Sequence, residues 1–243
     1  MNNNDYISYH QQNIKVDIWS DIICPFCYIG KRNLEQALEQ TGLSDHVNIV
    51  WHTFELAPDA QTDPGSSIYD VLGKRKGWST EQSEQIHRQM EEKAKLSGLE
   101  YHFDQTIPAN SRKAHRLLHL AKKHGVQNDV KERLLKGYFT DGHNIDDIDF
   151  LVETARHAGL QETDTLHALE SEEIEQNLRE DIDIARKLGI EGVPFFILNQ
   201  KYAISGAQPV EVFVQALEKV NGELHPEPSS NEDDASCDPD GRC

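Results

Sequence analysis

The sequence has no long apolar segment and contains only four cysteines. Its first thirteen residues are polar and lack the apolar core of a secretory signal, and no apolar run reaches the length of a membrane span. We therefore expect a cytoplasmic protein that does not enter a membrane. Because thiols are kept reduced in that compartment, the four cysteines are expected to serve catalysis, redox sensing or metal binding rather than structural disulfides.

Positive charge is also scarce. The chain carries 24 Lys and Arg residues against 42 Asp and Glu residues, which gives a formal net charge of −18. This balance disfavours nucleic acid as a partner, because binding to phosphate backbones depends on cationic side chains. The length of 243 residues allows one large domain, or a smaller domain that carries an insertion.

The chain is organised around Cys24 and Cys27, which stand in the motif C-P-F-C. The apolar run at 16–19 predicts a buried strand before the motif, and apolar residues at helical spacing over 34–38 predict a helix after it that ends at Gly42. Cys24 is thus expected at a helix start, where free N–H groups and the helix dipole stabilise a thiolate and lower its pKa. With a second thiol one turn away, the pair predicts a dithiol–disulfide redox centre.

Two other interpretations of the cysteine pair remain open at this point. In the first, the pair is half of a zinc site, which needs a further Cys or His pair nearby. In the second, the two cysteines are structural. His115 and His119 have an i, i+4 spacing that can bind metal, but no third ligand follows them in sequence. We therefore predict no metal site.

The order of the other expected elements predicts an α/β thioredoxin fold, βαβ…ββα, interrupted by an all-helical insertion domain. The second strand is expected at 47–54, a tight hairpin joins strands at 193–198 and 201–205, and a closing helix runs from Pro209 to Gly222. Between 64 and 188 the pattern is helical throughout. The predicted domains are 14–63 with 189–222 for the thioredoxin-like part, 64–188 for the insertion, and 223–243 for a flexible acidic tail.

The tail contains a second cysteine pair. Residues 238–241 read Asp-Pro-Asp-Gly, which favours a type I turn that brings Cys237 and Cys243 within bridging distance. A second redox pair, metal ligation and no function at all remain open for these two cysteines.

Several sequence blocks together resemble a known family. The blocks are DIWSDIICPFCYIGK, VWHTFEL, NSRKAHRLLHLA, LLKGYFTDGHNIDD, GVPFFILNQKYAISGAQ and the cysteine-bearing tail. They are similar to the DsbA-like thioredoxin-fold oxidoreductases, and within them to the cytoplasmic FrnE-like branch. The resemblance implies that Cys24 is the nucleophile and Cys27 its resolving partner. It also implies a cis bond between Val193 and Pro194, with Pro194 facing the cysteines and the Val193 backbone pairing with an extended substrate.

The resemblance implies an enzyme that acts on protein or peptide disulfides. No cofactor is expected beyond the redox-active disulfide itself, with glutathione or a thioredoxin-type protein as a candidate reductant. The oligomeric state is left undetermined. An alternative is a glutathione-dependent transferase or isomerase, similar to the kappa-class transferases and the hydroxychromene-carboxylate isomerases, which place a serine where Cys24 stands. A redox-regulated chaperone or a zinc-binding protein is a third alternative.

Overall fold

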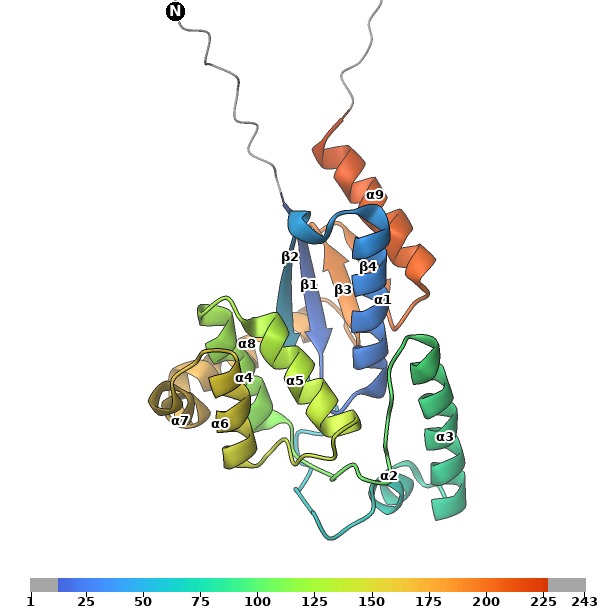
Figure 1. Ribbon diagram of the computed structural model, residues 1–243, viewed down its shortest axis with the longest axis vertical. Helices are drawn as coiled ribbons and strands as arrows, with labels where there is room; N and C mark the ends of the chain where they lie inside the picture. The colour runs from blue at the N-terminus through green and yellow to red at the C-terminus, as the bar shows by residue number, and fades with distance from the viewer. Residues whose placement is uncertain (1–12, 227–243) are drawn as a thin grey trace, which may run out of the picture.

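A computed structural model describes residues 13–226 (Figure 1). Its strands are β1 (Ile14–Ser20), β2 (Val47–Thr53), β3 (Phe195–Leu198) and β4 (Tyr202–Ser205). They form one sheet in the order β2-β1-β3-β4, in which β1 and β2 are parallel and the other neighbours are antiparallel. The predicted α/β thioredoxin fold with added helices is confirmed.

Helices follow the first strand, separate the second strand from the third, and close the chain. They are α1 (Pro25–Thr41), α2 (Ile68–Lys76), α3 (Thr80–Leu96), α4 (Arg112–Lys123), α5 (Gln127–Phe139), α6 (Ile148–His157), α7 (Glu162–Glu170), α8 (Glu172–Lys187) and α9 (Val210–Leu224), with a short 3-10 helix at Ser44–His46. Local signals fix several ends. Gly42 ends α1 with a positive φ of 67°, and Ser79 with Gln82 forms the capping box that begins α3. Helices α2 and α7 were not predicted individually, since nine residues each are too few for a clear periodic pattern.

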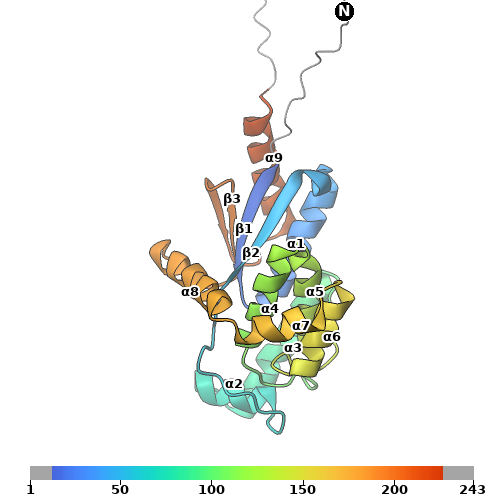
Figure 2. The ribbon, with the colours of Figure 1, turned by 90° about the vertical axis from the view of Figure 1, so that its left-hand side faces the viewer.

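Helices cover both faces of the sheet (Figure 2). Alternate strand residues such as Val16 and Phe196 face α1 and α9 and form one core with them. On the other face Trp19 packs with Ala185 and Ile190, at and just after the end of α8. Helix α8 therefore lies against the sheet, although it falls within the segment 64–188 that was predicted as the insertion. A larger core of helix residues lies beyond the end of the sheet where Cys24 stands.

A buried ionic network holds α8 to the sheet. His52 on β2 stands between two carboxylates, with Nε2 2.8 Å from Asp17 Oδ1 and Nδ1 2.7 Å from Asp181 Oδ1. Asp181 also accepts the backbone N–H of Thr53 at 2.8 Å. Asp181 of α8 is thereby tied directly to β2, and through His52 to Asp17 on β1.

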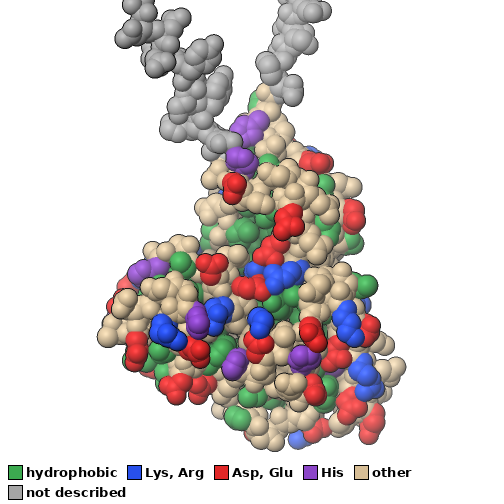
Figure 3. Space-filling view, in the orientation of Figure 1, with side chains coloured by type: hydrophobic (Ala, Val, Ile, Leu, Met, Phe, Trp, Pro, Cys, Tyr) green, Lys and Arg blue, Asp and Glu red, His purple; other side chains and the backbone are tan. Residues whose placement is uncertain are grey.

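A second ionic cluster joins α1 to α5. Lys31 binds Glu35 and Glu132, and Arg32 binds the same two carboxylates. On the face seen in Figure 3, Lys and Arg side chains stand beside Asp and Glu side chains instead of gathering into one basic patch. The negative excess of the sequence therefore coexists with local pairing of charge.

The end of the described chain differs from the prediction in two ways. Pro209 is the N-cap of α9 rather than its first residue, and Gly222 lies inside the helix, which continues to Leu224. Packing of Phe213, Leu217 and Val220 against the sheet outweighs the small helix propensity of one glycine. The tail predicted from residue 223 thus begins within this helix.

Cys237 and Cys243 lie outside the described residues. None of the helices within 13–226 combines the length and the hydropathy of a membrane span.

Candidate functional site at the cysteine pair

Cys24 and Cys27 lie at the N-terminus of α1. Cys24 is the N-cap, in an extended backbone conformation, and Pro25 follows as the first helical residue. The Cys27 N–H donates to the Cys24 carbonyl at 3.0 Å, which places the second sulfur one turn into the helix. Both cysteines carry free thiols, and they are 3% and 0% exposed. The predicted position of the pair at a strand-to-helix junction is confirmed.

Val193 and Pro194 lie directly beside this pair. The peptide bond between them is cis, and the Cys24 thiol donates a hydrogen bond to the Val193 carbonyl at 3.4 Å. Pro194 packs against α1, because a Cβ added at Gly30 would lie 2.9 Å from its Cγ. Only glycine permits this close approach. Two pairs of residues that are far apart in the sequence are therefore brought to one place, and their roles in binding and chemistry remain predictions.

The two thiols share their protons unequally, and the direction differs from the expectation for Cys24. Its hydrogen bond to Cys27, its burial and the nearby Asp21 carboxylate raise the pKa of Cys24 well above the ordinary value. Burial alone would raise the pKa of Cys27, but the hydrogen bond from Cys24 and the charge of Lys131 lower it. When the reduced pair loses its first proton, the remaining proton thus resides on Cys24 and the negative charge on Cys27. The helix dipole at the N-cap is outweighed by these nearer groups.

Lys131 lies within this site, although the sequence analysis did not select it. Its side chain on α5 is fully buried, and its Nζ has no hydrogen-bond partner among residues 13–226. The Nζ lies 5.2 Å from the centre of the Trp51 ring, and burial lowers the pKa of Lys131 to about 8. The sequence held a signal for this burial. Lys131 shares the helical stripe of Leu134, Leu135 and Tyr138 at i+3, i+4 and i+7, a position where a lysine is unusual.

Asp21 lies beside the cysteine pair and contacts His115, one of the two histidines whose spacing was considered for metal binding. The Asp21 carboxylate is fully buried, accepts the Leu56 N–H at 2.7 Å and lies 3.2 Å from His115 Nε2. Burial raises the pKa of Asp21, but these hydrogen bonds hold it below its usual value. His119 Nε2 instead lies 3.0 Å from the Thr53 hydroxyl. The two histidines thus have different partners. Within 13–226, no three His, Cys, Asp or Glu side chains are grouped to hold a metal ion.

A cavity of about 330 Å³ opens beside Cys24. Its wall is mostly apolar and includes Phe26 and Val193, which lie beside the cysteine pair, together with Trp78 and Met90. Arg75 and Lys76 add positive charge to its lining. Further lining residues are Ile23, Cys24, Pro25, Leu56, Ile68, Leu72, His87, Phe103, Thr106, Tyr138, Phe139 and Gly192. A substrate that reaches Cys24 through this cavity therefore meets surroundings that favour apolar groups.

His87 offers this cavity a hydrogen-bond acceptor. The side chain is 1% exposed, and Nδ1 lies 2.6 Å from the Ser83 carbonyl, so Nδ1 carries the proton. Burial lowers the pKa of His87, which keeps the ring neutral. Its Nε2 is buried without a partner among the described residues.

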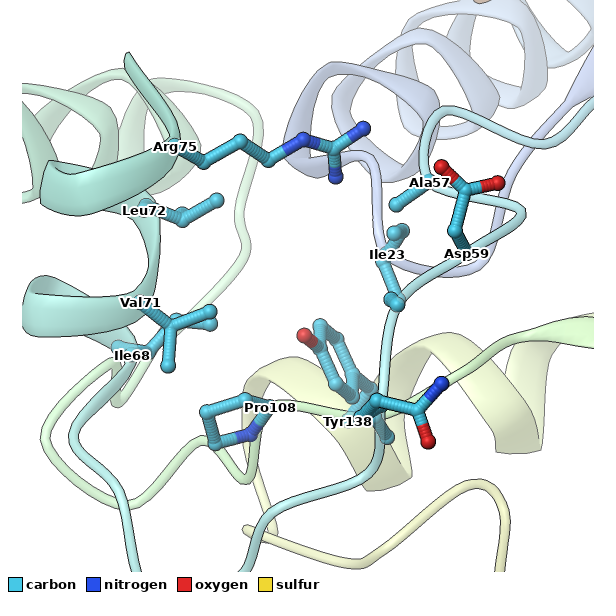
Figure 4. A pocket seen from close by; sticks show the side chains of 12 residues that line it. Ile23, Ala57, Asp59, Ile68, Val71, Leu72, Arg75, Pro108 and Tyr138 are labelled. Carbon is cyan, nitrogen blue, oxygen red and sulfur yellow. The ribbon is translucent and has the colours of Figure 1, made fainter. Parts of the chain in front are cut away.

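A second hollow, of about 240 Å³, adjoins the first. Figure 4 shows Arg75 extending from α2 toward Ala57 and Asp59, across a space floored by Pro108 and Tyr138. Its guanidinium donates to the Leu56 carbonyl, which ties α2 to the segment after β2. Arg75 thus lines both hollows and fixes the wall between them.

The geometry agrees with three comparisons. The profile described as DSBA-like thioredoxin domain matches residues 15–218. The solved structure described as probable DsbA oxidoreductase SCO1869, from Streptomyces coelicolor, is 36% identical, with a TM-score of 0.80 and coverage of 94% of this chain and 97% of that one. The uncharacterized protein YwbO of Bacillus subtilis (strain 168) is 28% identical over 208 residues, which are 84% of this chain and 96% of that protein. The fold is shared with the cytosolic disulfide reductase DsbM of Pseudomonas aeruginosa, at 16% identity and a TM-score of 0.62 over 85% of this chain and 98% of that one. The chain therefore belongs to the family of DSBA-like thioredoxin domains.

Proposed function

We propose that this protein is a thiol–disulfide oxidoreductase that acts on protein or peptide disulfides in the cytoplasm. The observation that carries the proposal is the contact between the Cys24 thiol, at the N-terminus of α1, and the carbonyl of Val193, which precedes the cis-linked Pro194. A nucleophilic sulfur and the Val193 backbone then face the same substrate. Assignment to the FrnE-like branch remains part of the proposal.

The chemistry requires two exchanges of sulfur partners. Cys24 loses its proton, and its sulfur attacks one sulfur of the substrate disulfide, while the other substrate sulfur leaves and takes up a proton. The Cys27 thiolate then attacks Cys24 Sγ, the bond between Cys24 and the substrate breaks, and the second substrate sulfur leaves. Two electrons have passed from the cysteine pair to the substrate. Glutathione or a thioredoxin-type dithiol is proposed to reduce the Cys24–Cys27 disulfide again.

The cavity beside Cys24 suggests what surrounds the substrate disulfide. Phe26 and Leu56 are 37% and 39% exposed at its edge, which is high for large apolar side chains. We propose that they contact an apolar residue next to the substrate cysteine. The Val193 backbone pairs with the extended substrate segment, and the His87 acceptor receives an N–H or O–H from it.

The test uses a peptide disulfide with a leucine beside one cysteine, and a second peptide with aspartate in that position. Wild-type protein should reduce the leucine peptide faster. Cys24→Ser should lose the activity, and Cys27→Ser should accumulate a mixed disulfide with the peptide that is visible by mass spectrometry. Cys24→Ser protein that retains turnover would show that the assignment of the nucleophile is wrong.

A further inference from the structure

Lys131 is a buried charge whose surroundings do not compensate it. A buried ammonium without partners is costly, and native proteins rarely leave such a group unpaired. Asp21 is the nearest carboxylate that acts on its charge, but its oxygens already accept the Leu56 N–H and contact His115. Lys131 therefore needs another counter-charge. The neighbouring cysteine sulfurs can supply it, because they become negatively charged as thiolates.

The groups that face Lys131 come from three directions. Cys27 and Cys24 at the start of α1, and Asp21 before it, act on Lys131 as negative charges, and Lys31 on α1 repels it. From β2 the face of the Trp51 ring lies against it. Among these groups Cys27 has the strongest attraction to Lys131, and it gains its charge only when the disulfide is reduced.

Ser20 supports the same pairing. Its hydroxyl oxygen is fully buried and has no hydrogen-bond partner among the described residues, and it lowers the pKa of Cys27. Two buried polar groups without partners among the described residues thus both act on Cys27. A thiolate at Cys27 provides what both of them lack, a negative acceptor.

We propose that Lys131 holds the proton that accompanies reduction of the disulfide, so that a Cys27 thiolate faces a Lys131 ammonium in the reduced protein and a neutral Lys131 amine lies beneath the disulfide in the oxidised protein. The inference rests on the proposed oxidoreductase function. On reduction, two thiols of the external reductant supply two electrons and two protons and become a disulfide. One proton goes to the Cys24 sulfur and the other to Lys131 Nζ.

The proton returns in the step that resolves the mixed disulfide. Cys24 is then bonded to the substrate and has no hydrogen to donate to Cys27, so Lys131 is the cation left to stabilise the Cys27 thiolate. When Cys27 attacks Cys24 Sγ, the negative charge moves to the leaving substrate sulfur. Lys131 loses its counter-charge and gives up its proton, which balances the proton taken up by that sulfur.

The test titrates Cys27 alone, by the ultraviolet absorbance of its thiolate in a Cys24→Ser background. Adding Lys131→Met should raise the midpoint of the titration by about one pH unit, an about tenfold loss of thiolate near neutral pH. The control is Lys136→Met, which removes an exposed lysine of the same helix and should leave the midpoint unchanged. Equal midpoints in the Lys131→Met and Lys136→Met proteins would overturn the proposal.

Lys131→Arg provides a second test, which applies even if the Lys131→Met protein does not fold. Arginine keeps a positive charge but does not release a proton, so the Cys27 midpoint should stay low. The oxidised Lys131→Arg protein then buries a cation without a counter-charge. The drop in melting temperature from wild type to Lys131→Arg should therefore be larger in the oxidised state than in the reduced state. Equal losses in the two redox states would contradict the proton-holding role.

The titration needs no substrate, which separates the two proposals. If the midpoint moves as expected while the wild-type protein reduces no disulfide, the oxidoreductase function is wrong and the pairing of Lys131 with Cys27 stands. If disulfide reduction proceeds and the midpoint does not move, the function stands and the role of Lys131 is wrong.

Discussion

Lys31 and Lys131 both have buried side chains, but within residues 13–226 only Lys31 is bound directly by carboxylates. Lys31 on α1 is bound by Glu35 and Glu132, and Glu132 also binds Arg32 and the Tyr28 hydroxyl. Lys131 precedes Glu132 directly on α5. Its Nζ, however, has no hydrogen-bond partner among residues 13–226. Adjacent residues of one helix thus serve two regions, the ion cluster between α1 and α5 and the space beneath Cys27.

The difference shows how one helix supports both structure and chemistry. In the ion cluster the charges are compensated at all times, so the cluster fixes α5 against α1 whatever the redox state. Beneath Cys27, the positive charge of Lys131 is compensated only when Cys27 is a thiolate. The first arrangement stabilises the fold, and the second makes the energy of the site depend on the state of the cysteines.

The largest effect is expected from Lys131 as pH rises. Lowering its pKa from 10.5 to about 8 costs the folded protein about 3 kcal/mol while the lysine is charged. Because a base with a lowered folded pKa binds its proton less well than in the unfolded chain, this penalty is complete below about pH 8 and disappears as pH rises toward 10.5. Denaturant unfolding of the reduced wild type should therefore gain stability over that range relative to Lys131→Met. Parallel pH curves for the two proteins would contradict the prediction.

In the ion cluster between α1 and α5, where the charges are paired, removing a charge is expected to destabilise the fold. Glu132→Gln leaves Lys31 buried with one carboxylate instead of two, and should lower the free energy of unfolding by about 2 kcal/mol. The matched control is Glu92→Gln, which breaks an exposed pair with Lys95 and should cost less than about 0.5 kcal/mol. Both variants should keep the Cys27 midpoint of the wild type. A shift of that midpoint in Glu132→Gln would show that the two regions are coupled.

A smaller effect is expected at His52, where a titratable ring lies between two carboxylates. Burial alone would lower the pKa of His52, but its hydrogen bonds to Asp17 and Asp181 raise it above 6.5. The stability that this charge contributes is therefore complete below pH 6.5 and is lost as pH rises through the raised pKa. His52→Gln should have lower stability in acid and a flatter pH dependence through neutrality. A variant that follows the wild-type curve would exclude His52 as the source of the slope.

The smallest effect is expected from the cysteines in the tail, which lie far in sequence from both lysines. We propose that Cys237 and Cys243 exchange electrons with the Cys24–Cys27 pair. Replacing both tail cysteines with serine should leave single-turnover exchange at Cys24 unchanged and reduce steady-state turnover when the external reductant is limiting. Unchanged steady-state turnover, with no bridge between a tail cysteine and Cys24 by mass spectrometry, would show that the tail takes no part.

Much of the framework could be predicted because it depends on local sequence. The C-P-F-C motif between a buried strand and a helix, the Gly42 helix end and the capping box at Ser79 are each determined by residues a few positions apart. The strands around Asn199 and Gln200 were expected for the same reason, and both of these residues adopt the positive φ that a tight turn requires. The resemblance added the proximity of Val193 to Cys24, which is 169 positions away.

The sequence by itself determined the order of elements and the residues that carry reactive sulfur, since periodicity, caps and turns act over short distances. Only the tertiary structure decided where the charges of the site reside. Cys24 was expected to have the lower pKa from its place at a helix start, but its hydrogen bond to Cys27, its burial and Asp21 raise its pKa, while Lys131 from the distant α5 lowers that of Cys27. Electrostatic effects on a buried thiol depend on its distances to charges on other elements, and a sequence pattern does not give those distances.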